Sequence, residues 1–124
     1  MMKTIWITLV FACAAAALPS HADELGPHKK LTGVYRVYGG GLGDPSVPTP
    51  QDKKVMFSIS GAAAKEIFNA IGPDKKDICT EGSSTRVRSK DDGNLSCLRS
   101  AKGEYSCNFG FDLVSGKSIG GIVC

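Results

Sequence analysis

The chain has 124 residues, with 15 Lys and Arg against 12 Asp and Glu, and a net charge of +3. Because basic and acidic side chains are nearly equal in number, the charge gives no electrostatic basis for nucleic-acid binding. No run after residue 22 is long and apolar enough to resemble a transmembrane helix.

The first 22 residues have the three parts of a secretory signal peptide. Lys3 supplies the positive start, residues 5–18 form an apolar run, and the small residues Ser20 and Ala22 occupy the minus-three and minus-one positions. The run is shorter than the ~20 residues of a membrane-spanning helix. We therefore expect cleavage after Ala22 and a periplasmic or secreted protein; the short alanine-rich signal favours a bacterial host. A lipoprotein route is less favoured, because residues 10–13 resemble a lipobox only loosely.

Cys13 would leave with this signal, so the exported chain keeps Cys79, Cys97, Cys107 and Cys124. An even number of cysteines in an exported chain favours two disulfides. Zinc sites usually pair their ligands two to four residues apart. The gaps here are 17, 9 and 16 residues, so we expect no metal site.

The rest of the chain is expected to form a flexible segment at residues 23–30 and a single domain at 31–124. Residues 31–38 are rich in β-branched and aromatic side chains and predict a strand. Residues 39–54 hold four glycines and three prolines, a content that excludes regular structure. We expect a long loop there, either disordered or a contact surface for a partner.

In residues 55–60, Val55, Phe57 and Ile59 alternate with Met56, Ser58 and Ser60, which predicts a second strand. Ser60 is then a suitable N-cap for a helix over residues 61–71, which Gly72 and Pro73 would end. The apolar stripe of this helix consists of Ala64, Ile67, Phe68 and Ile71.

Turn sequences divide the remainder into four antiparallel strands, at residues 85–89, 94–99, 104–113 and 117–123. In the third, the odd-numbered residues 105–113 are apolar and face inward, where we expect the helix to pack. The even-numbered residues 106–112 are expected to face solvent. The predicted fold is therefore α+β: one helix on a mostly antiparallel sheet of five to six strands, stapled by two disulfides.

The turn between the first two of these strands fixes their register. A three-residue loop ending at Gly93 would place Val87 opposite Cys97 and turn Arg86 and Arg88 outward.

The turns also constrain the disulfides. A turn centred on Lys102 places Cys97 opposite Cys107, whereas one at residues 115–116 places Cys107 opposite Cys124. Since both cannot be bonded, we favour Cys97–Cys107 with Cys79–Cys124, over Cys79–Cys97 with Cys107–Cys124.

A catalytic set is not found. The one histidine after residue 22 is His28, in the flexible segment, where it has no fixed partner to make it a general base. Pairing of the cysteines leaves no free thiol as a nucleophile. We therefore expect a protein that is not an enzyme and takes no cofactor.

Two functions remain, and the oligomeric state stays open. The first is a protein-binding module, such as an inhibitor or immunity protein of an envelope or secreted enzyme, whose partner is a protein of the envelope or cell exterior. The second is an envelope-associated protein that binds cell-wall material through a basic strand face, although these charges could instead protect a solvated sheet edge. The candidate partner-binding residues are Gly40, Leu42, Asp44 and Pro45 in the loop and Arg86, Arg88 and Arg99 on the strands.

Overall fold

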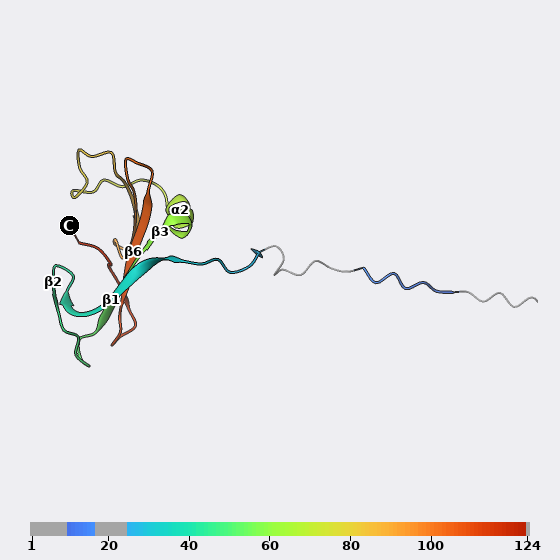
Figure 1. The fold of residues 1–124 in the computed structure, drawn as a ribbon, viewed down its shortest axis with the longest axis horizontal. Coiled ribbons are helices and arrows are strands. Elements are labelled where there is room, and N and C mark those ends of the chain that lie inside the picture. Colours follow the sequence, from blue (N-terminus) through green and yellow to red (C-terminus); the bar gives the residue numbers. More distant parts are fainter. Residues whose placement is uncertain (1–9, 17–24, 124) are drawn as a thin grey trace, which may run out of the picture.

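The computed structural model describes residues 10–16 and 25–123. In this part of the chain a helix packs on one antiparallel sheet, an α+β fold as predicted (Figure 1). The strands lie in the order β2-β1-β3-β6-β5-β4, and β7 pairs with the end of β6. The elements are β1 (Thr32–Gly41), β2 (Asp44–Ser46), β3 (Lys54–Ser60), α2 (Gly61–Ala70), β4 (Arg86–Lys90), β5 (Leu95–Arg99), β6 (Tyr105–Asp112) and β7 (Ser118–Ile119).

The helix α2 forms where its apolar stripe predicted it and ends one residue early, with Ile71 as its C-cap. Ala64 and Phe68 are its buried residues, and they pack on Cys97 and on the neighbouring strands. Ser60 is the N-cap as predicted, but its side chain makes no capping hydrogen bond.

The helix covers only part of the aromatic face on which we expected it to pack. Its ten residues extend about 15 Å, whereas the eight residues of β6 extend about 26 Å. Cys107 is fully buried under α2, but Phe111 and Leu113 are 39% and 48% exposed. The predicted packing is therefore confirmed at one end of β6 and wrong at the other.

The opposite face of the sheet is covered as well, which corrects the prediction that it faces solvent. Asn108 and Gly110 are buried there, because residues 119–123 cross β6 on this side. A Cβ atom at Gly121 would lie 2.4 Å from the Phe109 nitrogen, so only glycine allows the two backbones to approach so closely. Figure 1 shows α2 and the C-terminal end of the chain on opposite sides of the sheet.

The turn between β4 and β5 is one residue longer than predicted. Lys90 pairs with Leu95, which leaves residues 91–94 in the connection. Asp91 adopts a φ of +55°, and its carbonyl accepts a hydrogen bond from the Asn94 amide at 2.9 Å. Aspartate tolerates this left-handed conformation better than most residues, so the turn closes over four residues.

This single extra residue moves every side chain of β4 to the other face of the sheet. Arg88, and not Val87, lies opposite Cys97, so the predicted register is wrong. Val87 is buried on the face away from α2. Arg86 and Arg88 lie on the face that carries α2 and do not point outward as predicted.

The Gly/Pro-rich segment 39–54 is an irregular loop, as its composition predicted, only over residues 47–53. β1 continues to Gly41 and pairs with β2 around a two-residue turn. Gly40 allows this with a φ of +68°, and Pro45 lies in an edge strand, where a missing N–H costs no ladder hydrogen bond. Residues 39–46 are therefore a short hairpin that extends the sheet.

The last predicted strand is shorter than expected. Of residues 117–123, only Ser118 and Ile119 form β7, and Ile119 pairs with Gly110. In this register Cys107 is not opposite residue 124, so the turn at residues 115–116 does not favour that disulfide.

The disulfide Cys97–Cys107 is present, as we favoured, and it joins directly opposed residues of β5 and β6. This excludes the alternative pairing of Cys79 with Cys97. Cys79 is not a free thiol. Its predicted partner Cys124 lies outside the described residues, so the second disulfide stays a prediction.

The N-terminal region adds little to the fold. Residues 10–16 and 26–31 have no regular structure, and the latter lead into β1 (Figure 1). The predicted cleavage position after Ala22 lies outside the described residues, so export stays a prediction. In the described part of the chain, no helix has the length and apolarity needed to cross a membrane.

Candidate partner-binding site

Arg86 and Arg88 hold the segment after α2 against the sheet. The Asp74 carboxylate accepts hydrogen bonds from Arg86 Nε at 2.7 Å and from Arg88 Nε at 2.8 Å. Arg88 Nη1 also donates to the Phe68 carbonyl at 2.9 Å, which satisfies a carbonyl at the end of the helix. The Arg88 guanidinium lies 4.3 Å from the centre of the Phe68 ring. These two arginines therefore have a structural role inside the domain.

Arg99 completes the predicted basic set. It lies directly opposite Arg86 on the neighbouring strand, 5.9 Å from the centre of the Tyr105 ring. The structure thus brings the three predicted arginines together on one face. Because Arg86 and Arg88 already bind Asp74, they have fewer free donors for cell-wall material than the sequence suggested.

The two arginines lower the pKa of Asp74 from its ordinary 3.8 to about 2, with the hydrogen bond from Arg86 as the largest cause. A folded pKa below the unfolded value stabilises the fold above pH 4, and this contribution is lost as the pH falls towards 2. We expect the Asp74 carboxyl carbon to titrate near pH 2 by NMR, and Asp74→Asn to weaken the pH dependence of unfolding in that window. A wild-type midpoint near pH 4 would contradict this ion-pair network.

Asp52 and Lys54 fix the β1–β2 hairpin through the backbone of Gly40. Asp52 Oδ2 accepts a hydrogen bond from the Gly40 amide at 2.8 Å, and Lys54 Nζ donates to the Gly40 carbonyl at 2.9 Å. Lys54 also pairs with Asp52 and is the main cause of the lowered pKa of that carboxyl, followed by the Gly40 amide. Sequence reasoning missed this pair, whose signal is an acid and a base two residues apart at the start of a strand.

A groove of about 460 Å³ lies on the sheet face away from α2. It is lined by Leu42 and Pro45 of the hairpin and by Ile122 and Val123 of the C-terminal segment. The residues that complete the lining are Val34, Tyr35, Arg36 and Tyr38 of β1, Met56 of β3, and Gly121.

The groove is apolar with one cationic group beside it. Val34 is 69% exposed, and Ile122 and Val123 are also among the exposed large hydrophobic residues. Contiguous exposed apolar surface of this kind marks interaction sites. Arg36 is exposed and supplies the charge, a guanidinium suited to a carboxylate of a partner.

The structure separates the predicted loop residues into three roles. Leu42 and Pro45 line the groove, whereas Gly40 is used by the Asp52–Lys54 pair. Asp44 is exposed at the start of β2 and lies outside the groove lining. The predicted arginines lie on the opposite face of the sheet, so the two predicted contact regions do not form one surface.

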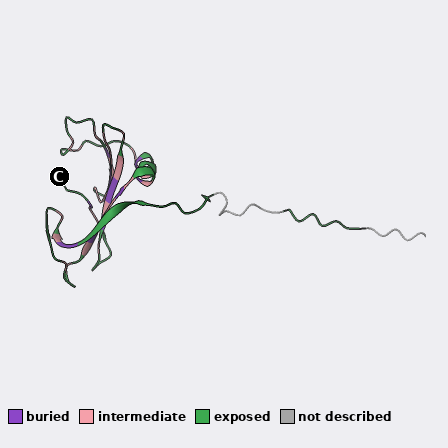
Figure 2. Cartoon of the chain, in the orientation of Figure 1, coloured by how far each residue is buried: buried purple, intermediate pink, exposed green. Residues whose placement is uncertain are grey.

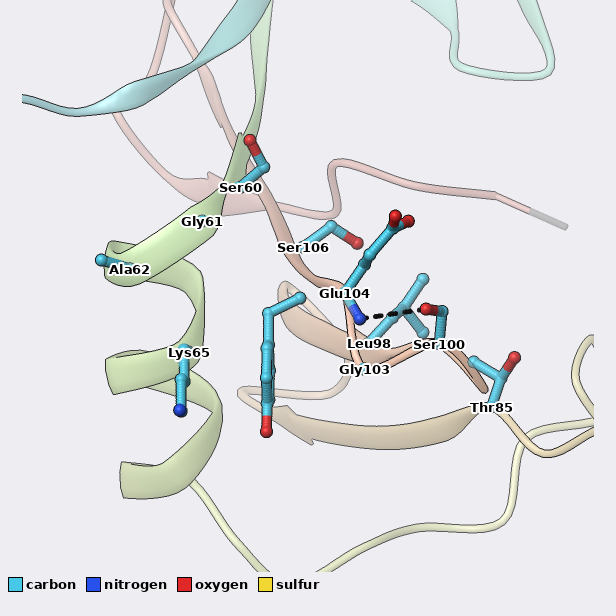
Figure 3. A pocket seen from close by; sticks show the side chains of 11 residues that line it. Ser60, Gly61, Ala62, Lys65, Thr85, Leu98, Ser100, Gly103, Glu104 and Ser106 are labelled. Atoms are coloured by element: carbon cyan, nitrogen blue, oxygen red, sulfur yellow. Dashed lines mark hydrogen bonds between the residues drawn. The ribbon is translucent and has the colours of Figure 1, made fainter.

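A second pocket, of about 680 Å³, lies between the first turns of α2 and the β5–β6 connection (Figure 3). Lys65 and Glu104 lie on different sides of it and do not point toward each other. The Ser100 hydroxyl accepts a hydrogen bond from the Glu104 amide at 3.1 Å, and no described hydroxyl in this pocket is hydrogen-bonded to a carboxylate or histidine. We assign no reaction to it. Its hydroxyl-bearing residues are Ser60, Thr85, Ser100, Tyr105 and Ser106.

Metal ligands and known relatives add nothing to this description. Within residues 10–16 and 25–123, no group of three or more His, Cys, Asp or Glu side chains could hold a metal ion. No known protein family, no curated protein and no solved structure matches this chain.

Proposed function

We propose that this chain is an exported, non-catalytic protein-binding module that holds an envelope or secreted protein in the groove, as an inhibitor or immunity protein does. The observation that carries the proposal is the position of Leu42 and Pro45. Both were predicted as contact residues, and both line an apolar groove together with Ile122 and Val123.

The groove is well suited to binding because its surroundings are fixed before a partner arrives. The hairpin is held to β3 by hydrogen bonds from Asp52 and Lys54, and the sheet is cross-linked by Cys97–Cys107. A preorganised surface loses little conformational entropy on association, which leaves more of the contact energy for affinity.

The groove also indicates what its partner presents. An apolar side chain would fill the space between Leu42 and Ile122, and a carboxylate beside it would meet the Arg36 guanidinium. An apolar anchor surrounded by polar contacts is the usual arrangement at the centre of a protein interface.

We test this with Leu42→Asp, which places a carboxylate on the apolar side of the groove. Burying an unpaired charge is costly, so we expect capture of the partner from an envelope extract to weaken at least about tenfold, or 1.4 kcal/mol. The matched control is Val47→Asp, since Val47 is 83% exposed and outside the groove lining. Deletion of residues 39–50 is less informative, because it would remove β2 and the end of β1.

Two results would contradict the proposed function. The first is equal capture by the wild type and by Leu42→Asp when circular dichroism shows both to be folded. The second is retention on purified cell-wall material that Arg99→Glu abolishes and Leu42→Asp leaves unchanged, which would favour the alternative function at the arginine face.

A further inference from the structure

One edge of β1 is unpaired along residues 32–38. The strand pairs with β3 over this whole stretch on one side. On its other side it pairs with β2 only at Gly39–Gly41, and no other described strand contacts it there. Figure 2 shows β1 exposed along most of its length. Seven consecutive residues therefore border an open sheet edge.

This edge lacks the features that normally protect an edge strand. Such strands are usually blocked by charges, prolines, bulges or a covering segment. β4, at the other end of the sheet, carries several basic residues, and the Lys75 amide hydrogen-bonds to the Val87 carbonyl at 2.7 Å along it. The free stretch of β1 has no proline and a single charge, Arg36, and its Tyr35 is 71% exposed.

An aromatic surface reaches the same edge on the α2 side. The Phe57 and Phe109 rings stack with their centres 5.2 Å apart, and the Tyr35 ring lies 6.3 Å from Phe57. Phe111 packs against this pair and stays exposed because α2 is too short to cover it. A strand added beside β1 would extend the sheet past Tyr35 and cover part of its exposed ring.

We propose that a second copy of this chain fills this edge, with the two β1 strands antiparallel across a two-fold axis. Such an axis, perpendicular to the sheet, places one residue opposite its own copy. The free stretch 32–38 has Tyr35 at its centre, so pairing Tyr35 with Tyr35 of the second copy uses the whole stretch. The result is one continuous sheet through both copies.

The chemistry of the edge favours a second copy and this register. Centred on Tyr35, the pairing sets Arg36 opposite Val34 and joins the two aromatic surfaces. Centred on Arg36, it would place two like charges directly opposite each other, which is unfavourable. In a closed dimer neither β1 has an unpaired stretch left. An edge that stays unpaired can instead pair with further chains and lead to aggregation. The pairing uses the free backbone groups of β1, so the proposal does not rest on the proposed function, although Val34 and Arg36 of the paired stretch also line the groove.

Cysteine cross-linking tests the register. Directly opposed residues of antiparallel strands have Cα atoms about 4.5–5.5 Å apart, within the range that a disulfide spans. Oxidised Tyr35→Cys should therefore run as a covalent dimer on a non-reducing gel. The control is Val37→Cys, on the same strand and the same face. In the proposed register Val37 lies opposite Gly33 of the second copy and about 14 Å from the second Val37, so this variant should not cross-link. Equal cross-linking of the two variants would overturn the register.

Charge substitution tests the association itself. At about 100 µM, far above a micromolar Kd, we expect sedimentation to give twice the monomer mass for the wild type and the monomer mass for Tyr35→Lys. Mixing Tyr35→Lys with Tyr35→Glu should restore the dimer, because opposite charges then face each other. A monomeric wild type at this concentration, or a mixture that stays monomeric, would overturn the proposal.

Discussion

Replacing Phe68 with alanine should lower the free energy of unfolding by about 3–5 kcal/mol. Phe68 is 1% exposed and is the largest side chain among the fully buried residues. Its ring packs edge-on against Tyr105 at 5.3 Å and under the Arg88 guanidinium at 4.3 Å. Alanine would leave a cavity between α2 and the sheet and would remove both contacts.

Urea unfolding followed by circular dichroism measures this change. Phe68→Leu keeps much of the buried volume and loses the two ring contacts. We therefore expect its free energy of unfolding to lie between those of the wild type and Phe68→Ala. The control is Ile78→Ala, which should change stability by less than about 0.5 kcal/mol because Ile78 is 84% exposed. A loss below about 1 kcal/mol for Phe68→Ala would show that α2 does not pack as described.

Removing the Cys97–Cys107 disulfide should cost about 3 kcal/mol. The two cysteines are ten residues apart in sequence, so the bond removes loop-closure entropy from the unfolded chain. Both are fully buried, and Cys107 Sγ lies 3.4 Å from the Ala64 carbonyl oxygen, a packing contact because a disulfide sulfur carries no proton. The bond therefore holds the place where α2 meets the sheet.

The double variant Cys97→Ala/Cys107→Ala tests this without leaving a lone buried thiol. Chemical unfolding under oxidising conditions should show the lower free energy of unfolding. Cys107→Ala alone should lower it at least as much, since it breaks the same bond. A double variant within about 1 kcal/mol of the wild type would mean that the sheet does not need this cross-link.

The sequence predicted the parts of the fold that depend on local spacing. The stripe containing Ala64 and Phe68 recurs with helical period, so α2 was found nearly to the residue. The turn centred on Lys102 set the register that brings Cys97 opposite Cys107. In both cases a short stretch of chain determines the structure.

The predictions failed where one residue in a turn decides the outcome. A four-residue connection at 91–94, in place of three, moved Arg86 and Arg88 to the α2 face. No sequence pattern shows that Asp91 will adopt a left-handed conformation, since its hydrogen bond to Asn94 forms only in the closed turn. The predicted basic surface thereby became an ion-pair network with Asp74.

The candidate site was predicted on one side only. The glycine and proline content drew attention to Leu42 and Pro45, although it also suggested a loop where a hairpin forms. The other side, with Ile122 and Val123, depends on how the C-terminal segment crosses the sheet. That path is set by the close approach of Gly121 to Phe109, a tertiary contact with no local signal.

The central claim, that the groove holds a protein partner, is tested most directly by photo-cross-linking in the native host. A photoreactive amino acid at position 42 and another at position 122 should each trap the same protein, because both positions line the groove. The same probe at position 78 should trap nothing specific. Specific cross-links from position 99 on the arginine face, with none from positions 42 and 122, would contradict the claim.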